Sequence, residues 1–293
     1  MSLIARRFIL TASDADRRSA TARLRTHGRE IVMKRIAPVL LAATAIAAGQ
    51  TPTLTQADME RFLKTARIAE TKRQITSNSR RVVLDDGKMR HDASIQTVNV
   101  TRGEFEASQD TAVNVKDSYR FNIAAYELSK ILGLNMVPPC VEREVDGMPA
   151  AVTWWVDDVL MDEFERLRAN TQPPDPEKWM RQVNIVRVFD QLVFNTDRNR
   201  SNLLITKDWK LWMIDHTRTF HVSKNLLQPE NLTRCDRNLL QRLKTLNGTE
   251  LTQKLKLNAV EIEALLARRD AIIEQFDRII AQKGEQAVLY DEE

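Results

Sequence analysis

The stretch Asn195-Thr-Asp-Arg-Asn-Arg-Ser-Asn202 is the most informative part of this chain of 293 residues for predicting its fold. Before it, apolar residues recur at helical spacing over residues 177–195, which predicts a long helix. After it come two β-rich runs, residues 203–206 and 211–214. A polar loop between a helix and a short hairpin is therefore expected, and the hairpin leads directly into Asp215.

Asp197, Asn202 and Asp215 are residue types that phosphoryl transfer from ATP requires. One carboxylate must orient the attacking hydroxyl and accept its proton, while an amide oxygen and a second carboxylate hold a divalent metal against the phosphates. We predict Asp197 in the first role, and Asn202 and Asp215 as ligands of Mg²⁺ or Mn²⁺. The alternative is that these residues only form a polar turn and cap the next segment, since Asp and Asn are common in turns.

The segments around this stretch predict an α+β fold with two lobes. The front half combines β-rich runs with one main helix, and the back half is mostly helical. Expected helices cover residues 55–72, 119–134, 239–246, 250–256 and 259–282, and expected strands cover a hairpin over 81–100 and the runs 141–145 and 150–156. The predicted organisation is an upstream extension (1–32), a signal peptide (33–49), a helix and linker (50–80), a small lobe (81–158) and a helical lobe (159–293).

Over residues 183–220 the sequence resembles the atypical kinases of the protein-kinase-like superfamily, which include phosphatidylinositol 3- and 4-kinases, toxin-antitoxin serine kinases and secretory-pathway kinases. In phosphatidylinositol kinases the two motifs read Asp-Arg-His-x-x-Asn and Ile-Asp-Phe-Gly. The matching segments here are Asp197-Arg198-Asn199-Arg200-Ser201-Asn202 and Ile214-Asp215-His216-Thr217. The resemblance implies a two-lobed kinase-like fold, phosphotransferase activity with ATP, and catalytic roles for Asp197 and Arg198. The departures from both motifs leave the acceptor class open.

The nucleotide-binding side of this resemblance is less complete. Kinases carry a lysine in the strand motif V-A-I-K, and the matching strand here, Ala-Ser-Ile-Gln96, has an amide at that position. An amide can bond phosphate oxygens but does not neutralise their charge, so Lys88 and Lys116 are considered as substitutes. The helix glutamate that pairs with the kinase lysine aligns with Glu127, or alternatively with Asn122 at the start of the helix.

A tryptophan pair and two cysteines have two interpretations each. Trp154-Trp155 lies where the hinge of a kinase contacts adenine, which makes Trp155 a candidate nucleotide contact, although strand tryptophans are often core residues. Cys140 and Cys235 are too few for a metal site, and are either one disulfide or two free buried thiols.

Positive charge gathers at the front of the chain. Seven arginines against three carboxylates in residues 1–32 account for the whole formal charge of +4. Met33-Lys34-Arg35 then precede an apolar run, residues 36–48, which is shorter than the ~20 residues of a membrane-spanning helix and ends in small residues. This is the pattern of a bacterial signal peptide at 33–49, with Met33 as the true start. The alternatives are a cytoplasmic extension before a membrane anchor and a twin-arginine-like leader.

Export would place the mature chain in the periplasm or outside the cell. Removal of residues 1–49 leaves a net charge of about −2, so the composition does not indicate a nucleic-acid partner, and no membrane span is expected in the mature chain. The leading hypothesis is an exported ATP-dependent phosphotransferase acting on a hydroxyl of a protein, lipid or small molecule. The alternatives are a catalytically silent kinase-like binding module, an envelope structural protein, and transfer of AMP.

Overall fold

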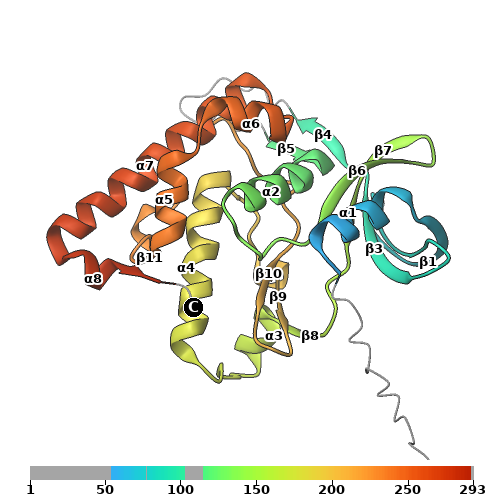
Figure 1. Ribbon diagram of the computed structural model, residues 1–293, viewed down its shortest axis with the longest axis horizontal. Helices are drawn as coiled ribbons and strands as arrows, with labels where there is room; N and C mark the ends of the chain where they lie inside the picture. Colours follow the sequence, from blue (N-terminus) through green and yellow to red (C-terminus); the bar gives the residue numbers. More distant parts are fainter. Residues whose placement is uncertain (1–53, 77, 103–114, 292–293) are drawn as a thin grey trace, which may run out of the picture. The chain divides into compact units, whose positions relative to one another are not determined.

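The computed structural model of the protein describes residues 54–76, 78–102 and 115–291 (Figure 1). These residues belong to one compact unit that runs from residue 52 to the end of the chain. The predicted extension (1–32) and signal peptide (33–49) lie outside the described residues. In the described part, no helix is long and apolar enough to cross a bilayer.

The front half is built on a five-stranded antiparallel sheet with the order β1-β2-β3-β7-β6 (Figure 1). Its strands are β1 (Arg67–Thr76), β2 (Ser79–Asp85), β3 (Arg90–Gln96), β7 (Met148–Trp154) and β6 (Cys140–Val145). The turn between β2 and β3 follows the predicted chemistry: the Asp86 carboxylate accepts two backbone N–H groups, and Gly87 adopts a φ of +84° that suits glycine.

The first helix is shorter than its apolar spacing predicts. Helix α1 (Gln56–Thr65) begins at a capping box formed by Thr55 and Asp58, but the chain turns extended at Ala66 and enters β1. Residues 67–72 are therefore strand, not helix. Side chains of β1 are almost all exposed, so this edge strand has no alternating apolar pattern that the sequence could reveal.

Helix α2 (Tyr119–Ile131) connects the sheet to the second half of the chain. Two short strands, β4 (Asn99–Arg102) and β5 (Val115–Ser118), lead into it, and Ser118 caps its first turn. Ala124, Ala125 and Leu128 are fully buried in the main core. The backbone N–H of Ser118 also donates to Thr217, which joins the start of α2 to the segment after β10.

The second half packs helices around a small antiparallel sheet with the order β10-β9-β8. The sheet is formed by β8 (Val159–Asp162), β9 (Leu203–Thr206) and β10 (Leu211–Met213). The helices are α3 (Glu163–Arg168), α4 (Pro176–Val193), α5 (Arg237–Thr245), α6 (Gly248–Leu255), α7 (Ala259–Lys283) and α8 (Glu285–Val288). A parallel pair, β11 (Cys235–Asp236) and β12 (Leu289–Tyr290), lies beside them. This sheet-then-helix order agrees with the predicted fold class.

Candidate active site

Two cavities that share lining residues bring together segments from both halves of the chain. The first, of about 330 Å³, has an apolar part that includes Val137, Cys140 and Met213. The second, of about 310 Å³, is more polar.

Both are lined by Ile75, Ser79, Gln96 and Asp215. Asn122, Trp155 and Asn202 line only the first, whereas Asp117, Asp197 and Arg218 line only the second. Most of the predicted site residues therefore meet here.

The end of α4 positions Asp197. Phe194 has a left-handed backbone with φ +51°, which turns the chain sharply out of the helix. The Asn195 side chain then accepts the backbone N–H of Asp197 at 3.0 Å, and Asn202 donates its side-chain amide to the Asp197 carbonyl at 3.2 Å. The Asp197 side chain itself is 40% exposed, so its carboxylate is accessible from solvent.

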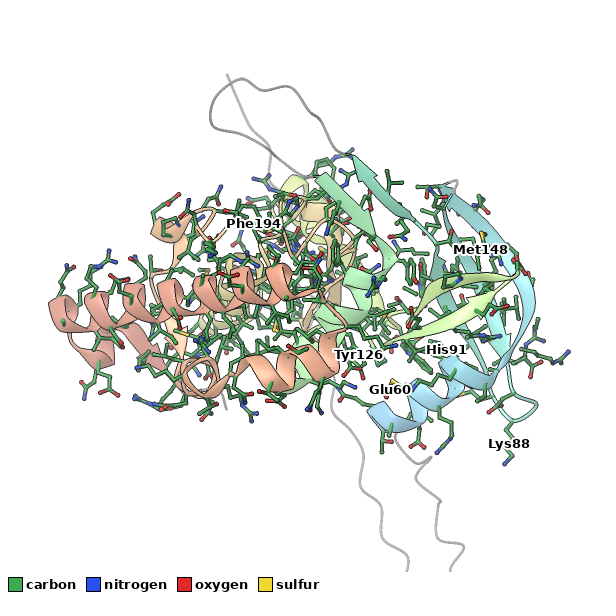
Figure 2. The ribbon with its side chains drawn as sticks, turned by 90° about the horizontal axis from the view of Figure 1, so that it is seen from above. Glu60, Lys88, His91, Tyr126, Met148 and Phe194 are labelled. Carbon is green, nitrogen blue, oxygen red and sulfur yellow. The ribbon has the colours of Figure 1, made fainter. Side chains whose placement is uncertain are left out.

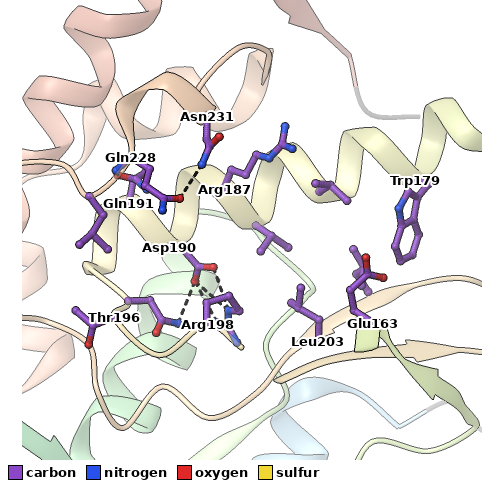
Figure 3. A pocket seen from close by; sticks show the side chains of 15 residues that line it. Glu163, Trp179, Arg187, Asp190, Gln191, Thr196, Arg198, Leu203, Gln228 and Asn231 are labelled. Carbon is purple, nitrogen blue, oxygen red and sulfur yellow. Dashed lines mark hydrogen bonds and ion pairs between the residues drawn. The ribbon is translucent and has the colours of Figure 1, made fainter. Parts of the chain in front are cut away.

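Arg198 is held in a network of buried polar groups. Its guanidinium pairs with Asp190 of α4, with Nε 3.0 Å from Oδ2, and the two side chains are only 11% and 12% exposed. It also donates to the backbone carbonyls of Asn202 and Ile214, and its Nη2 lies 2.9 Å from Nε2 of His216. A third cavity, of about 490 Å³, exposes one side of this pair (Figure 3). These contacts are those of a positioning residue that ties α4 to both motifs.

The contacts of His216 require a neutral imidazole. Burial, followed by the positive charge of Arg198, lowers the pKa of His216 well below its ordinary value. A neutral ring can accept a hydrogen bond from the guanidinium through Nε2. His216 therefore supports the site through its hydrogen bond with Arg198. Among the described residues, no cluster of three or more His, Cys, Asp or Glu side chains could hold a metal ion.

Asp215 and Asn202 are placed beside each other by the backbone. The N–H of Ile214 donates to the carbonyl of Asn202 at 3.0 Å, and Asp215 follows with a left-handed φ of +55°. Such a backbone is uncommon for a residue other than glycine and is concentrated at functional sites. Carboxylate and amide oxygens are the donors that Mg²⁺ and Mn²⁺ prefer. The donor set fits a metal that takes its remaining ligands from water and phosphate, which is how Mg²⁺ is usually held.

On the opposite wall, Gln96 and Asn122 form a neutral pair. The Asn122 amide donates to the Gln96 carbonyl oxygen, and its own carbonyl accepts the backbone N–H of His216 at 2.7 Å. Of the two helix positions considered from sequence, the structure places Asn122 against Gln96. Glu127 instead pairs with Lys130 at 2.9 Å, within a cluster that includes Glu60 and Tyr126 (Figure 2).

Neither lysine considered as a substitute for the missing cation lies at the cavities. Lys88 is exposed at the outer tip of the hairpin between β2 and β3 (Figure 2). Lys116 forms an ion pair with Glu261 of α7, with Nζ 2.7 Å from Oε1. The structure therefore does not bring Lys88, Lys116 or Glu127 together with Asp197, and neither lysine lines either cavity.

The two adjacent tryptophans differ in burial and in their contacts. Trp154 is buried and stacks on His91, with ring centroids 3.6 Å apart. Trp155 is half-buried and lines the first cavity, where the guanidinium of Arg81 lies 4.1 Å from its ring centroid. Trp155 is thus available as an aromatic contact.

Both cysteines are free and buried, and burial raises the pKa of the Cys140 thiol to about 12.

Sequence reasoning missed Asp117 and Arg218. Arg218 forms ion pairs with Asp117, with Nε 3.1 Å from Oδ2, and with Asp197, with Nη1 3.2 Å from Oδ2. Asp117 precedes α2 by two residues and is far from Arg218 in sequence. The only local signal was a charged residue three positions after Asp215, and such a residue is ordinary on a protein surface.

Comparisons with known proteins place the fold. No protein-family model matches the chain, and a comparison with curated protein sequences gives no match. Among solved structures, that of hydra Fam20 with sugar has a TM-score of 0.62 at 15% identity, over 80% of this chain and 92% of the hydra chain. The Golgi casein kinase with Mn and ADP bound has a TM-score of 0.58 at 12% identity, over 81% of this chain and 80% of that one. The proinflammatory kinase CtkA of Helicobacter pylori has a TM-score of 0.50 at 10% identity, over 76% and 98%. The chain therefore has an atypical protein-kinase-like fold.

Proposed function

We propose that this protein is an exported phosphotransferase that moves the γ-phosphoryl group of ATP to a hydroxyl acceptor with Mg²⁺ or Mn²⁺. The observation that carries the proposal is the meeting of Asp197, Asn202 and Asp215 around two cavities that share Asp215. In a kinase-like fold, these residue types at these positions suffice to orient a hydroxyl and hold a metal.

Each residue of the candidate site has a separate role in the proposed reaction. The Asp197 carboxylate orients the acceptor hydroxyl and takes its proton as the oxygen–γ-phosphorus bond forms. The bond between the γ-phosphorus and the bridging oxygen breaks, and its electron pair leaves with ADP. Asn202 and Asp215 would hold the divalent metal, which neutralises charge on the phosphates. Arg198 holds both motifs in register through the Asn202 and Ile214 carbonyls.

The first cavity suits the nucleoside. Its apolar wall includes Val137, Leu204 and Met213, which can cover the faces of a purine, and Trp155 lies on the same cavity. The nucleoside would then place its phosphates toward Gln96 and Asp215, where the first and second cavities share their lining. The acceptor would approach through the second cavity, where Asp197 is exposed.

A second candidate function is a catalytically silent module that binds nucleotide, and the neutral pair Gln96–Asn122 favours it. Active kinases carry a lysine–glutamate ion pair at these elements. Transfer of AMP on the same fold is a further alternative, because it uses the same metal and base with a different phosphorus atom as the centre of attack.

The test uses protein that starts at Gln50. We expect ATP with Mg²⁺ or Mn²⁺ to raise the thermal unfolding midpoint, and Asp215→Ala to abolish that shift because a metal ligand is lost. Absence of any ATP-dependent shift in the wild type would contradict both nucleotide-dependent functions. Sequencing the N-terminus of exported protein tests the leader: Gln50 or a near neighbour is expected, and a peptide from residues 1–32 contradicts the assigned start.

Activity separates the enzyme from the silent module. With radiolabelled γ-phosphate, Asp197→Ala should lower autophosphorylation by about 10²- to 10⁴-fold, the usual contribution of a general base. Asp270→Ala, which removes an exposed carboxylate of α7 that pairs with Arg269, is the matched control and should retain most of the activity. Wild-type protein that binds ATP without labelling itself or any acceptor mixture would favour the silent module. Label from α-phosphate would indicate AMP transfer.

A further inference from the structure

One cation stands out among the residues that line the two cavities. Three carboxylates, those of Asp117, Asp197 and Asp215, face the second cavity, and Arg218 is the only lysine or arginine that lines either cavity in the described part of the chain. ATP brings several negative charges to a site that is already acidic. A metal offsets part of that charge, and a protein cation is needed beside it.

In the structure Arg218 is bound to carboxylates. Its guanidinium bridges Asp117 and Asp197, and the neighbouring carboxylate of Asp117, with smaller effects of Asp197 and Asp215, raises the pKa of Arg218. The Arg218 side chain is 47% exposed. Ion pairs at such exposure are weak and are exchanged easily when a stronger partner arrives.

The backbone keeps Arg218 next to the catalytic segment whatever its side chain does. The carbonyl of Arg218 accepts the backbone N–H of Thr196 at 3.4 Å and the Thr196 hydroxyl at 3.2 Å. Thr196 immediately precedes Asp197. The guanidinium can therefore leave the Asp197 carboxylate and turn to a phosphate in the same cavity without movement of the main chain. A guanidinium fork also matches phosphate oxygens in a bidentate manner.

We propose that Arg218 is the phosphate-binding cation of this site, and that it exchanges Asp197 for the phosphates of the nucleotide when ATP binds. This inference rests on the proposed function. It accounts for Gln96 and Asn122, because the positive charge missing from β3 is supplied from the segment after Asp215. It also means that nucleotide binding frees the Asp197 carboxylate for the acceptor hydroxyl.

The test compares affinities for MgATP and for adenosine, by calorimetry, in the wild type, Arg218→Met and Arg218→Lys. We expect Arg218→Met to weaken MgATP binding at least about tenfold and to leave adenosine binding unchanged, because only the phosphates meet the guanidinium. Arg218→Lys should be intermediate, since an ammonium keeps the charge but loses the fork. Arg67→Met, which removes an exposed arginine paired with Asp85, is the matched control and should change neither affinity.

A second measurement follows Arg218 directly. The NMR signal of its side-chain Nε, assigned by its loss in Arg218→Lys, should shift with MgATP and stay in place with adenosine. This readout holds even if Arg218→Met does not fold. Equal MgATP affinity in the wild type and the folded variants would overturn the role of Arg218 but leave the proposed function standing. An Nε signal that does not shift with MgATP would have the same meaning. Wild-type protein that binds no MgATP would overturn the proposed function, and this inference with it.

Discussion

Two groups of residues around the candidate site, the charged wall and the neutral wall, are built from different chemistry. The charged wall comes from the helical half: Arg198, Asp190 and His216 connect α4, residues 195–202 and the segment after β10, and His216 is the member that lines the first cavity. The wall from the sheet half is neutral, with the amides of Gln96 and Asn122 bonded to each other. Arg198 thus holds the candidate segment of Asp197 and Asn202 beside Asp215, while the pair of Gln96 and Asn122 carries no charge.

The stability of the protein is more sensitive to substitutions in the charged wall than in the neutral wall. A buried charge stabilises a structure only while its partners are present, and removal of one partner leaves the other uncompensated. Asp190 and Arg198 are both nearly inaccessible, whereas Gln96 is uncharged and its replacement removes the hydrogen bond from Asn122 without leaving a buried charge. Substitutions should therefore affect folding at Arg198 and nucleotide affinity at Gln96.

The largest effect is expected at Arg198. Arg198→Met should lower the free energy of unfolding by about 3–5 kcal/mol, because it leaves the buried carboxylate of Asp190 without its charged partner. Urea unfolding followed by circular dichroism measures this. Arg200→Met, two residues along and exposed, is the control and should change stability by less than about 0.5 kcal/mol. A loss below about 1 kcal/mol at Arg198 would show that the two walls do not differ as described.

A smaller effect is expected from Gln96→Lys, which gives the neutral wall the cation it lacks. A lysine at the end of β3 should tighten MgATP binding by about tenfold, equivalent to about 1.4 kcal/mol, because it faces the part of the cavity shared with Asp215. Calorimetric titration measures the change. Gln172→Lys adds the same charge on an exposed loop and should have no effect. An unchanged affinity would mean that Gln96 does not face the phosphates.

The smallest effect concerns pH and the imidazole of the charged wall. Because burial lowers the pKa of His216 in the folded protein, the unfolded chain binds a proton first as the pH falls through about 6.5. Stability should therefore be complete above that pH and decline below it, with a smaller contribution from His221, whose pKa burial also lowers. Urea midpoints at pH 7.5 and 5.5 measure the decline. His216→Gln keeps an acceptor for Arg198 and should reduce the decline, and an equal decline in both proteins would contradict the assignment.

Much of the fold was predictable because its signals are local. The Asp86-Gly87 turn predicts its hairpin, helical spacing predicts α2, α4 and α7, and their observed bounds differ from the predicted ones by a few residues. Strand β1 was not predictable, because its side chains are exposed and its order comes from pairing with β2. The predicted helix therefore ran past Thr65 into this strand.

For the site, the sequence alone predicted the candidate catalytic segment: Asp197, Asn202 and Asp215 are recognisable because a helix, a loop and a hairpin hold them at short, fixed separations. The residues that face them could be found only from the folded chain. The choice of Asn122 over Glu127, the distance of Lys88 from the cavities, and the pairing of Asp117 and Arg218 depend on contacts between segments far apart in sequence. Spacing along the chain carries no information about such contacts, because packing of the whole core sets which faces meet.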